Sequence, residues 1–231
     1  GSSIPIEPGE HVMYGSYQGE PVEWRVLDKK DGEILLLSEY GLDAQPFDTS
    51  GKSRVDWKDS TIRKWLNDDF YNSAFSEKEK ENIVESKSEG FEEYNTSMNL
   101  TGGGKPYAYL EREIEDKVFL LSNTELCAYF SEDPYPGCYS DPYAHKELLC
   151  YPTAYAKQQL ETRYQTETCG WWLCNHVYED DSVELVSAYG QGSGTSRENI
   201  KANTKSIAVR PAMWVTWQSD MEMVEANQQV E

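Results

Sequence analysis

Two tryptophan-bearing segments near the C-terminus constrain the fold of this chain most strongly. The first, Cys169–His176, contains Trp171-Trp172, and the second, Ala208–Val215, contains Arg210-Pro211-Ala212. Each large aromatic side chain buries about 150–250 Å², so adjacent tryptophans are costly to leave in water. We expect both segments to form strands, with the two tryptophans packed in the core in preference to contacting a ligand.

Length and composition indicate a single domain. The chain has 231 residues, and no Gly/Ser-rich or Pro-rich linker divides it. With 7 Trp and 16 Tyr, a few large side chains can build the core, which favours a compact, loop-rich fold over a helical bundle. We expect a remnant and flexible start over residues 1–9, one domain over 10–217, and an acidic C-terminal tail over 218–231.

The charge balance excludes some partners. The 41 acidic and 21 basic residues give a formal charge of −20, which repels nucleic acid and anionic lipid surfaces. No apolar run reaches the ~18 residues that span a bilayer, so we expect no membrane insertion. Gly1-Ser2-Ser3 looks like a cut end, from which a signal peptide or lipid anchor was removed. The expected location is therefore extracellular or cell-surface anchored, and the oligomeric state stays open.

The N-terminal part predicts a β-hairpin. Val22, Trp24 and Val26 alternate with polar residues, residues 28–32 break the pattern, and residues 34–37 form a second apolar run. Gly32 is expected to supply the positive φ of a bulged turn. A third short strand is predicted over residues 11–14.

Capping patterns predict four helices. Ser60 precedes an apolar stripe at positions 62, 65, 66 and 70, and Ser76 with Glu79 forms a capping box for a short helix toward Val84. A second capping box, at residues 122–125, follows the buried strand predicted at 118–121 and begins a helix to about residue 130. Thr153 caps a helix through Leu160.

Loops and short strands fill the rest of the chain. Residues 88–112 and the Tyr-rich insertion at 131–149 are expected to be long loops, the latter a functional loop or a disordered one. Short strands are expected at 171–174, 183–188 and 207–215. Because strand and helix do not alternate as βαβ units, a doubly wound sheet is excluded.

Seven ordered motifs resemble those of an uncharacterised bacterial family, a domain of unknown function common in Gram-positive gut anaerobes. The resemblance extends from about residue 10 to residue 217. The motifs lie at residues 21–28, 36–38, 60–67, 119–122, 152–156, 170–173 and 209–212.

This resemblance implies a fold and a setting. The family is similar to the C-type-lectin-like fold of the formylglycine-generating enzymes, which implies an α+β domain with short antiparallel sheets, flanking helices and long loops. Members are secreted or surface proteins. Where the family reads Trp-Trp-Leu-Arg-Ser-Pro, this chain has Cys174-Asn175-His176 after Leu173, so any role of that arginine is lost or moved.

The five cysteines leave several interpretations open. They lie at positions 127, 138, 150, 169 and 174, and sequence proximity allows disulfides 138–150 and 169–174. Cys169, Cys174 and His176 could also bind a metal. Unpaired buried thiols are the leading expectation, because cysteine behaves as a small hydrophobe. We therefore expect no cofactor and no metal.

No pattern identifies an enzyme. The chain has three histidines, none in a nucleophile-elbow context, and no local pattern isolates a pair among its 41 carboxylates. The Gly-rich stretches at 102–104 and 190–194 lack the context of phosphate-binding loops and are interpreted as flexible loops. Glu179-Asp180-Asp181 is an oxygen cluster best explained as a solvated turn.

The leading hypothesis is a ligand-binding module for a glycan or an extracellular protein. One alternative is a degenerate formylglycine-generating-type oxidase using Cys169 and Cys174, and another is a structural segment of a larger surface protein. Tyrosines of the insertion suit sugar stacking and protein contacts alike. The candidate ligand contacts are Trp172, His176, Tyr178, Arg210, Tyr135, Tyr139 and Tyr143.

Overall fold

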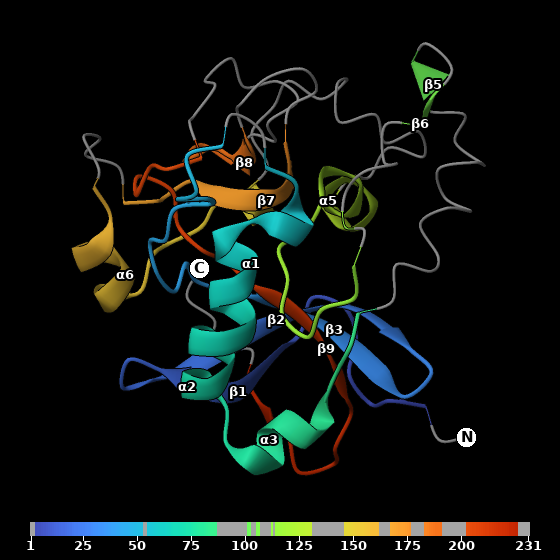
Figure 1. Ribbon diagram of the computed structural model, residues 1–231. Coiled ribbons are helices and arrows are strands. Elements are labelled where there is room, and N and C mark those ends of the chain that lie inside the picture. Colours follow the sequence, from blue (N-terminus) through green and yellow to red (C-terminus); the bar gives the residue numbers. More distant parts are fainter. Residues whose placement is uncertain are drawn as a thin grey trace.

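The fold is mixed α+β and is built on one antiparallel sheet (Figure 1). The computed structural model describes residues 3–52, 55–86, 101–102, 105–106, 112, 114–130, 146–161, 167–176, 183–190 and 202–225. The main sheet has the order β10-β1-β2-β3-β9-β4, and every neighbouring pair is antiparallel. Its strands are β1 (His11–Tyr17), β2 (Glu20–Lys30), β3 (Glu33–Ser38), β4 (Ile83–Val84), β9 (Ala212–Thr216) and β10 (Glu222–Met223).

Two further strand pairs lie outside this sheet. β7 (Trp171–His176) pairs with β8 (Val183–Val186), and β5 (Thr101–Gly102) pairs with β6 (Lys105–Pro106). β7 is tied to the chain before β9 by the bridge between Trp171 and Ala208. The α+β class with mostly antiparallel sheets is thus confirmed.

The predicted hairpin is confirmed, but its irregularity lies elsewhere. Strand β2 continues to Lys30, which pairs with Glu33, so the turn is only Asp31-Gly32, with φ of 54° and 79°. Two positive φ values in a two-residue loop match the twist of the flanking strands. The bulge lies instead between Val26 and Asp28, where Leu27 is the extra residue. The alternation breaks at Leu27 for this reason, before the turn begins.

The helical segment after residue 56 covers one face of the main sheet (Figure 1). It comprises η1 (Trp57–Asp59), α1 (Thr61–Trp65), the π-helical turn η2 (Leu66–Phe70), α2 (Tyr71–Ala74) and α3 (Glu77–Asn82). Ser60 caps α1 by accepting a hydrogen bond from the Arg63 amide at 3.3 Å, and the Ser76 capping box is present. The last helix ends at Asn82, earlier than predicted, because the chain then enters β4.

The remaining predicted helices are also confirmed. These are α5 (Asn123–Phe130) and α6 (Ala154–Gln159), with the 3-10 turn η4 (Lys146–Leu148) between them. In the second capping box, Ser122 Oγ accepts from the Glu125 amide at 3.1 Å, and Glu125 Oε1 accepts from the Ser122 amide at 2.9 Å. Thr153 caps α6 through the Ala156 amide at 3.1 Å.

Two predicted strands are shorter than expected. Residues 118–121 are fully buried, but only Phe119 forms a bridge, to Ala212. The strand expected over 207–215 begins at Ala212, after Pro211, which has no N–H to donate to a ladder. Ala208 and Val209 instead form single bridges to Trp171 and Asp43. The chain before β9 therefore contacts β7 and Asp43 through single bridges and is not part of a continuous strand ladder.

The ordered fold extends beyond the domain limits expected from the sequence. Ile6 is fully buried, and the Gly9 amide donates to the Val26 carbonyl at 2.8 Å, so the expected flexible start contributes to the core. Strand β10, inside the expected acidic tail, pairs with β1. Among the described residues, no helix is long and apolar enough to cross a bilayer.

Gly15 provides a test of the packing between β1 and the helical segment. It has φ of +69°, and a Cβ placed there would lie 2.6 Å from the Ala74 carbonyl oxygen and 2.7 Å from the Phe75 ring. We expect Gly15→Ala to lower the free energy of unfolding by about 3 kcal/mol, since strain and overpacking add. Gly19→Ala is the matched control, because Gly19 has φ of +83° and open space around it.

The control should cost about 1 kcal/mol through backbone strain alone. Urea unfolding of both variants measures the difference. Equal losses of unfolding free energy in the two variants would show that a side chain at residue 15 can be accommodated beside Ala74 and Phe75.

Candidate functional site

Two clusters of buried polar side chains stand out in the described part of the chain. One surrounds Asp116 and the other surrounds Arg210. They differ in how completely their polar atoms are paired, and this difference separates a structural role from a functional one.

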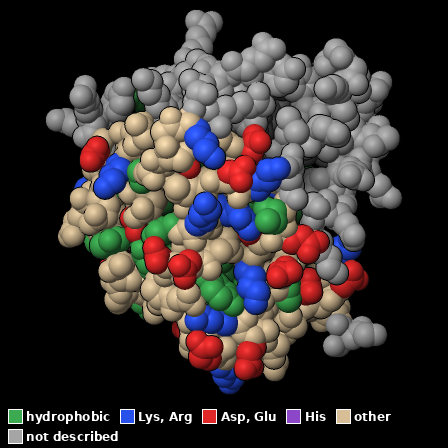
Figure 2. Space-filling view, viewed as in Figure 1, with side chains coloured by type: hydrophobic (Ala, Val, Ile, Leu, Met, Phe, Trp, Pro, Cys, Tyr) green, Lys and Arg blue, Asp and Glu red, His purple; other side chains and the backbone are tan. Residues whose placement is uncertain are grey.

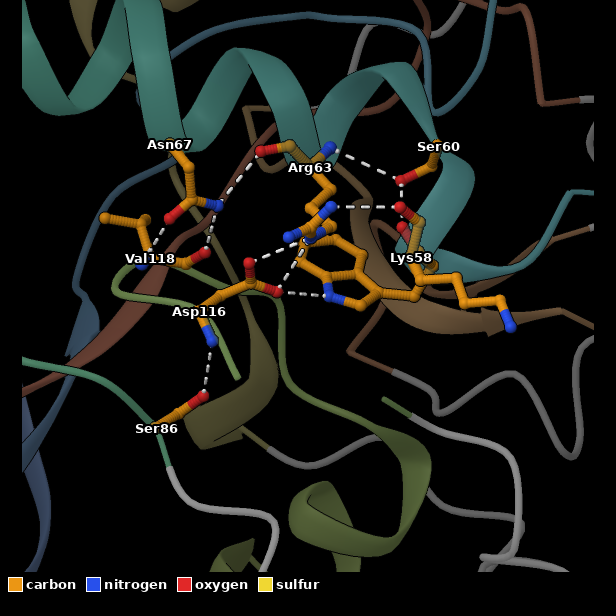
Figure 3. A network of polar contacts seen from close by, with 8 residues as sticks. Lys58, Ser60, Arg63, Asn67, Ser86, Asp116 and Val118 are labelled. Atoms are coloured by element: carbon orange, nitrogen blue, oxygen red, sulfur yellow. Dashed lines mark hydrogen bonds and ion pairs between the residues drawn. The ribbon is translucent and has the colours of Figure 1, made fainter. Parts of the chain in front are cut away.

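The Asp116 cluster joins helix α1 to the segment before residue 118 (Figure 3). Asp116 accepts hydrogen bonds from Trp57 Nε1 at 2.8 Å and from Arg63 Nε at 2.8 and 3.1 Å. Its backbone amide and carbonyl both bond to Ser86. Asn67, one helical turn beyond Arg63, bonds to both backbone groups of Val118.

Every bond in this cluster joins two parts of the fold. Burial raises the pKa of the Asp116 carboxyl, while the bonds from Trp57 and Arg63 act in the opposite direction. Neither of its carboxylate oxygens is left without a donor. We interpret the Asp116 cluster as a structural clamp between the helical layer and the chain that follows it.

Arg210 lies at the centre of the second cluster, just before β9. Its side chain is 1% exposed, and Nε donates to the Ser38 carbonyl at 2.6 Å. The guanidinium carbon lies 4.8 Å from the centre of the Trp171 ring, a cation–π contact. Nη2 lies 3.8 Å from Glu39 Oε2, which is an ion pair without a hydrogen bond.

Two atoms of this cluster have no hydrogen-bond partner: Arg210 Nη1 and Glu39 Oε2. Buried polar atoms are nearly always paired, because an unpaired one forfeits about 1–3 kcal/mol of solvation. One of these atoms is a donor and the other an acceptor. The Arg210 cluster therefore retains hydrogen-bonding capacity that the fold does not use.

His11 and Glu23 extend the cluster to the protein surface. His11 Nδ1 lies 2.9 Å from Glu23 Oε2, and His11 Nε2 lies 3.8 Å from Glu39 Oε2. The side chain of Glu39 is 28% exposed and that of Glu23 is 19% exposed, although the Oε2 atom of Glu39 is itself buried. Burial raises the pKa of Tyr40, and the charges of Glu23 and Glu39 raise it further.

Two cysteine thiols lie on the inner side of Arg210. Cys150 and Cys169 are both free and buried, and the Cys169 thiol donates to the Cys150 backbone carbonyl at 3.4 Å. Burial opposes ionisation of Cys150, but the bond from Cys169 and the charge of Arg210 lower its pKa. The pKa of Cys169 is raised by its bond to Cys150 and by burial.

The candidate contacts predicted from the sequence have separate locations. Trp172 is fully buried, donates from Nε1 to the Gln45 carbonyl at 3.0 Å, and meets Phe47 edge-on. Trp171 is also fully buried, so both tryptophans belong to the core. Arg210 is buried as well, and its Nη1 has no hydrogen-bond partner. The side chain of His176 and residues Tyr178, Tyr135, Tyr139 and Tyr143 lie outside the described residues.

Sequence reasoning missed Glu39, His11 and Glu23. Ser38, which holds Arg210, lies 172 positions before it in the chain, so no local motif joins them. The only local signal was polar residues at the ends of apolar strands. Only the pairing of β3 with β9 brings them to Arg210.

Cys169, just before β7, and Cys174, within it, have different neighbours from those expected. Cys174 Sγ accepts from Arg112 Nη1 at 3.8 Å, and the Arg112 guanidinium lies over the Phe119 ring. Cys169 carries a free thiol beside Cys150, so the disulfide 169–174 suggested by sequence proximity is not formed. No group of three or more metal-ligating side chains occurs among the described residues.

The outer face of the helical layer offers no comparable site. Figure 2 shows acidic and basic side chains interspersed over this face, with hydrophobic side chains only in small groups. Scattered opposite charges of this kind are typical of a solvated surface. The Arg210 cluster is therefore the stronger candidate among the described residues.

Comparison with known proteins identifies a family of undefined activity. Residues 31–217 match the family described as Domain of unknown function (DUF6273). Comparison with curated proteins and with solved structures gives no match.

The two clusters should respond differently to removal of their central charge. Asp116→Ala strands the buried donors of Trp57 and Arg63, and we expect it to cost about 3–5 kcal/mol of unfolding free energy. Arg210→Met keeps an unbranched side chain over Trp171 and removes a charge with an unpaired atom, so about 1–2 kcal/mol is expected. Asp69→Ala, on the exposed side of the helical segment, should change stability by less than about 0.5 kcal/mol.

Chemical denaturation of the three variants measures these differences. A loss for Arg210→Met as large as that for Asp116→Ala would mean that Arg210 is a structural clamp and not a reserved binding group.

Proposed function

We propose that this chain, which belongs to the DUF6273 family of domains of unknown function, is a glycan-binding module. Its contact surface comprises Glu39, Glu23, His11 and Tyr40, with Arg210 beneath them. The observation that supports this most directly is the coexistence of an unpaired donor on Arg210 and an unpaired acceptor on Glu39.

A hydroxyl group fits this pair chemically. A hydroxyl both donates and accepts, so one sugar hydroxyl can donate to Glu39 Oε2 and accept from a guanidinium N–H. Bonds to charged groups are the stronger ones, contributing about 1.5–3 kcal/mol each. Both unpaired atoms are buried, and the Glu39 side chain is 28% exposed against 1% for Arg210, so a ligand hydroxyl would reach them from the Glu39 side.

Aromatic side chains beside the carboxylates support the same ligand class. Tyr40 follows Glu39 directly, and Tyr151 is 48% exposed. The Gly41 amide donates to the Tyr151 carbonyl at 3.0 Å, which holds the two tyrosine-bearing segments next to each other. A tyrosine ring offers an apolar face to the C–H surface of a sugar and a hydroxyl to its polar edge.

The wider proposal keeps the setting expected from the sequence. Glycans are displayed outside cells, so we place the domain in a secreted or surface-anchored protein. The C-type-lectin-like character of the fold is part of this proposal and rests on the sequence motifs. Tyr135, Tyr139, Tyr143, Tyr178 and His176 remain proposed additional contacts. The oxidase alternative has less support, because Cys169 and Cys174 lie beside different partners.

Binding to a glycan array, followed by calorimetric titration of each positive glycan, tests the proposal. Glu39→Gln keeps the shape of the side chain but removes its charge, so we expect affinity to fall about 10-fold or more. Glu33→Gln is the matched control, because Glu33 is also partly exposed and lies at the opposite end of β3. Its affinity should match that of the unchanged protein.

Two outcomes would overturn the proposal. One is the absence of binding to any glycan, including the case in which the domain captures only an extracellular protein. The other is an equal affinity for the Glu39→Gln and Glu33→Gln variants, which would place the binding surface elsewhere.

A further inference from the structure

The two free thiols behind Arg210 have a geometry suited to covalent bonding. The Cys169 amide donates to the Cys150 carbonyl at 2.8 Å, and Cys169 Sγ donates to the same carbonyl at 3.4 Å. The backbones of the two residues are therefore in direct contact, and a disulfide needs Cα atoms within about 7 Å of each other.

Both sulfurs also point to the same place. A Cβ built on Gly41 would lie 3.3 Å from Cys169 Sγ and 3.6 Å from Cys150 Sγ, so the two thiols meet against this glycine. The same Cβ would lie 2.8 Å from the Ala208 side chain, so only glycine fits here. Packing around Gly41 thus confines the two thiols to one small volume.

We propose that Cys150 and Cys169 form a disulfide when the protein is exposed to an oxidising thiol–disulfide buffer. The bond would tie the chain after η4 to the start of β7, closing a loop between residues 19 positions apart. Both ends of this loop pack beside Arg210, so the disulfide would fix the inner wall of the Arg210 cluster. The inference is independent of the ligand proposed above.

The oxidation proceeds by two exchange steps. The Cys150 thiolate attacks one sulfur of a small disulfide such as oxidised glutathione, forming a mixed disulfide and releasing one small thiolate. Cys169 loses its proton and attacks the Cys150 sulfur, forming the protein disulfide and releasing the second small thiolate. The two protein thiols together lose two electrons and two protons, and the small disulfide is reduced to two thiols.

Cys150 is the better first nucleophile of the two. The positive charge of Arg210 helps to lower the pKa of Cys150, whereas the interaction with the Cys150 thiol and burial raise the pKa of Cys169. Because both side chains are buried, exchange takes place during folding or through local opening of the chain. Oxidation of the folded protein should therefore be slow and should accelerate in mild denaturant.

The test is refolding of the whole chain in a glutathione redox buffer, followed by alkylation, proteolysis and mass spectrometry. We expect a peptide pair linked through Cys150 and Cys169. The oxidised protein should melt about 5 °C or more above the reduced protein, since closing a loop of this length restricts the unfolded chain.

Single cysteine variants show whether the shift in Tm comes from this disulfide or from another cysteine. Cys150→Ala and Cys169→Ala should each abolish the shift in Tm, while Cys174→Ala should retain it. Mass analysis of the unsubstituted chain decides the matter even where a variant fails to fold. Recovery of both peptides fully alkylated, or of Cys150 linked to a different cysteine, would refute the proposal.

Discussion

The antiparallel pairing of β3 with β9 is the contact on which the rest of this structure depends. It joins a strand near residue 35 to one near residue 214 and so closes the two ends of the chain into one sheet. Strand β4 pairs on the other edge of β9, and Phe119 bridges to Ala212 at its start. The N-terminal meander alone would expose one face of fully buried leucines, Leu35 and Leu37 among them, so its stability depends on the returning C-terminal chain.

The pairing of β3 with β9 also forms the Arg210 cluster, and it explains why two polar atoms of the cluster lack hydrogen bonds. Pro211 stands between Arg210 and β9, so the chain departs from the ladder there and directs the guanidinium to the end of β3. The guanidinium is held by one carbonyl and one indole ring, and Glu39 is not close enough for a hydrogen bond. By contrast, the Asp116 carboxylate is saturated by two donors from the helical segment. One cluster is closed by the fold, and the other is left open toward a partly exposed carboxylate.

The cysteine pair and the carboxylate of Glu39 both interact with Arg210. Arg210 contacts Trp171 and Glu39, and its positive charge lowers the pKa of Cys150. The same charge therefore interacts with a buried thiol and with a partly exposed carboxylate. Oxidising the two thiols would remove the ionisable group of Cys150 from the neighbourhood of Arg210. Glycan binding and disulfide formation are proposed separately, but their residues share this one guanidinium.

The sequence determined the local structure and the composition of the core. Capping boxes at Ser76 and Ser122 and the stripe after Ser60 located helix starts, because caps depend on residues three positions apart. Tertiary structure decided what the sequence could not: the bulge at Leu27, the late start of β9, and the meeting of Glu39 with Arg210. These features depend on strands far apart in the chain, where pairing and packing override local preference. The tryptophans that most constrained the fold are core residues, and the candidate site is formed by the arginine beside them.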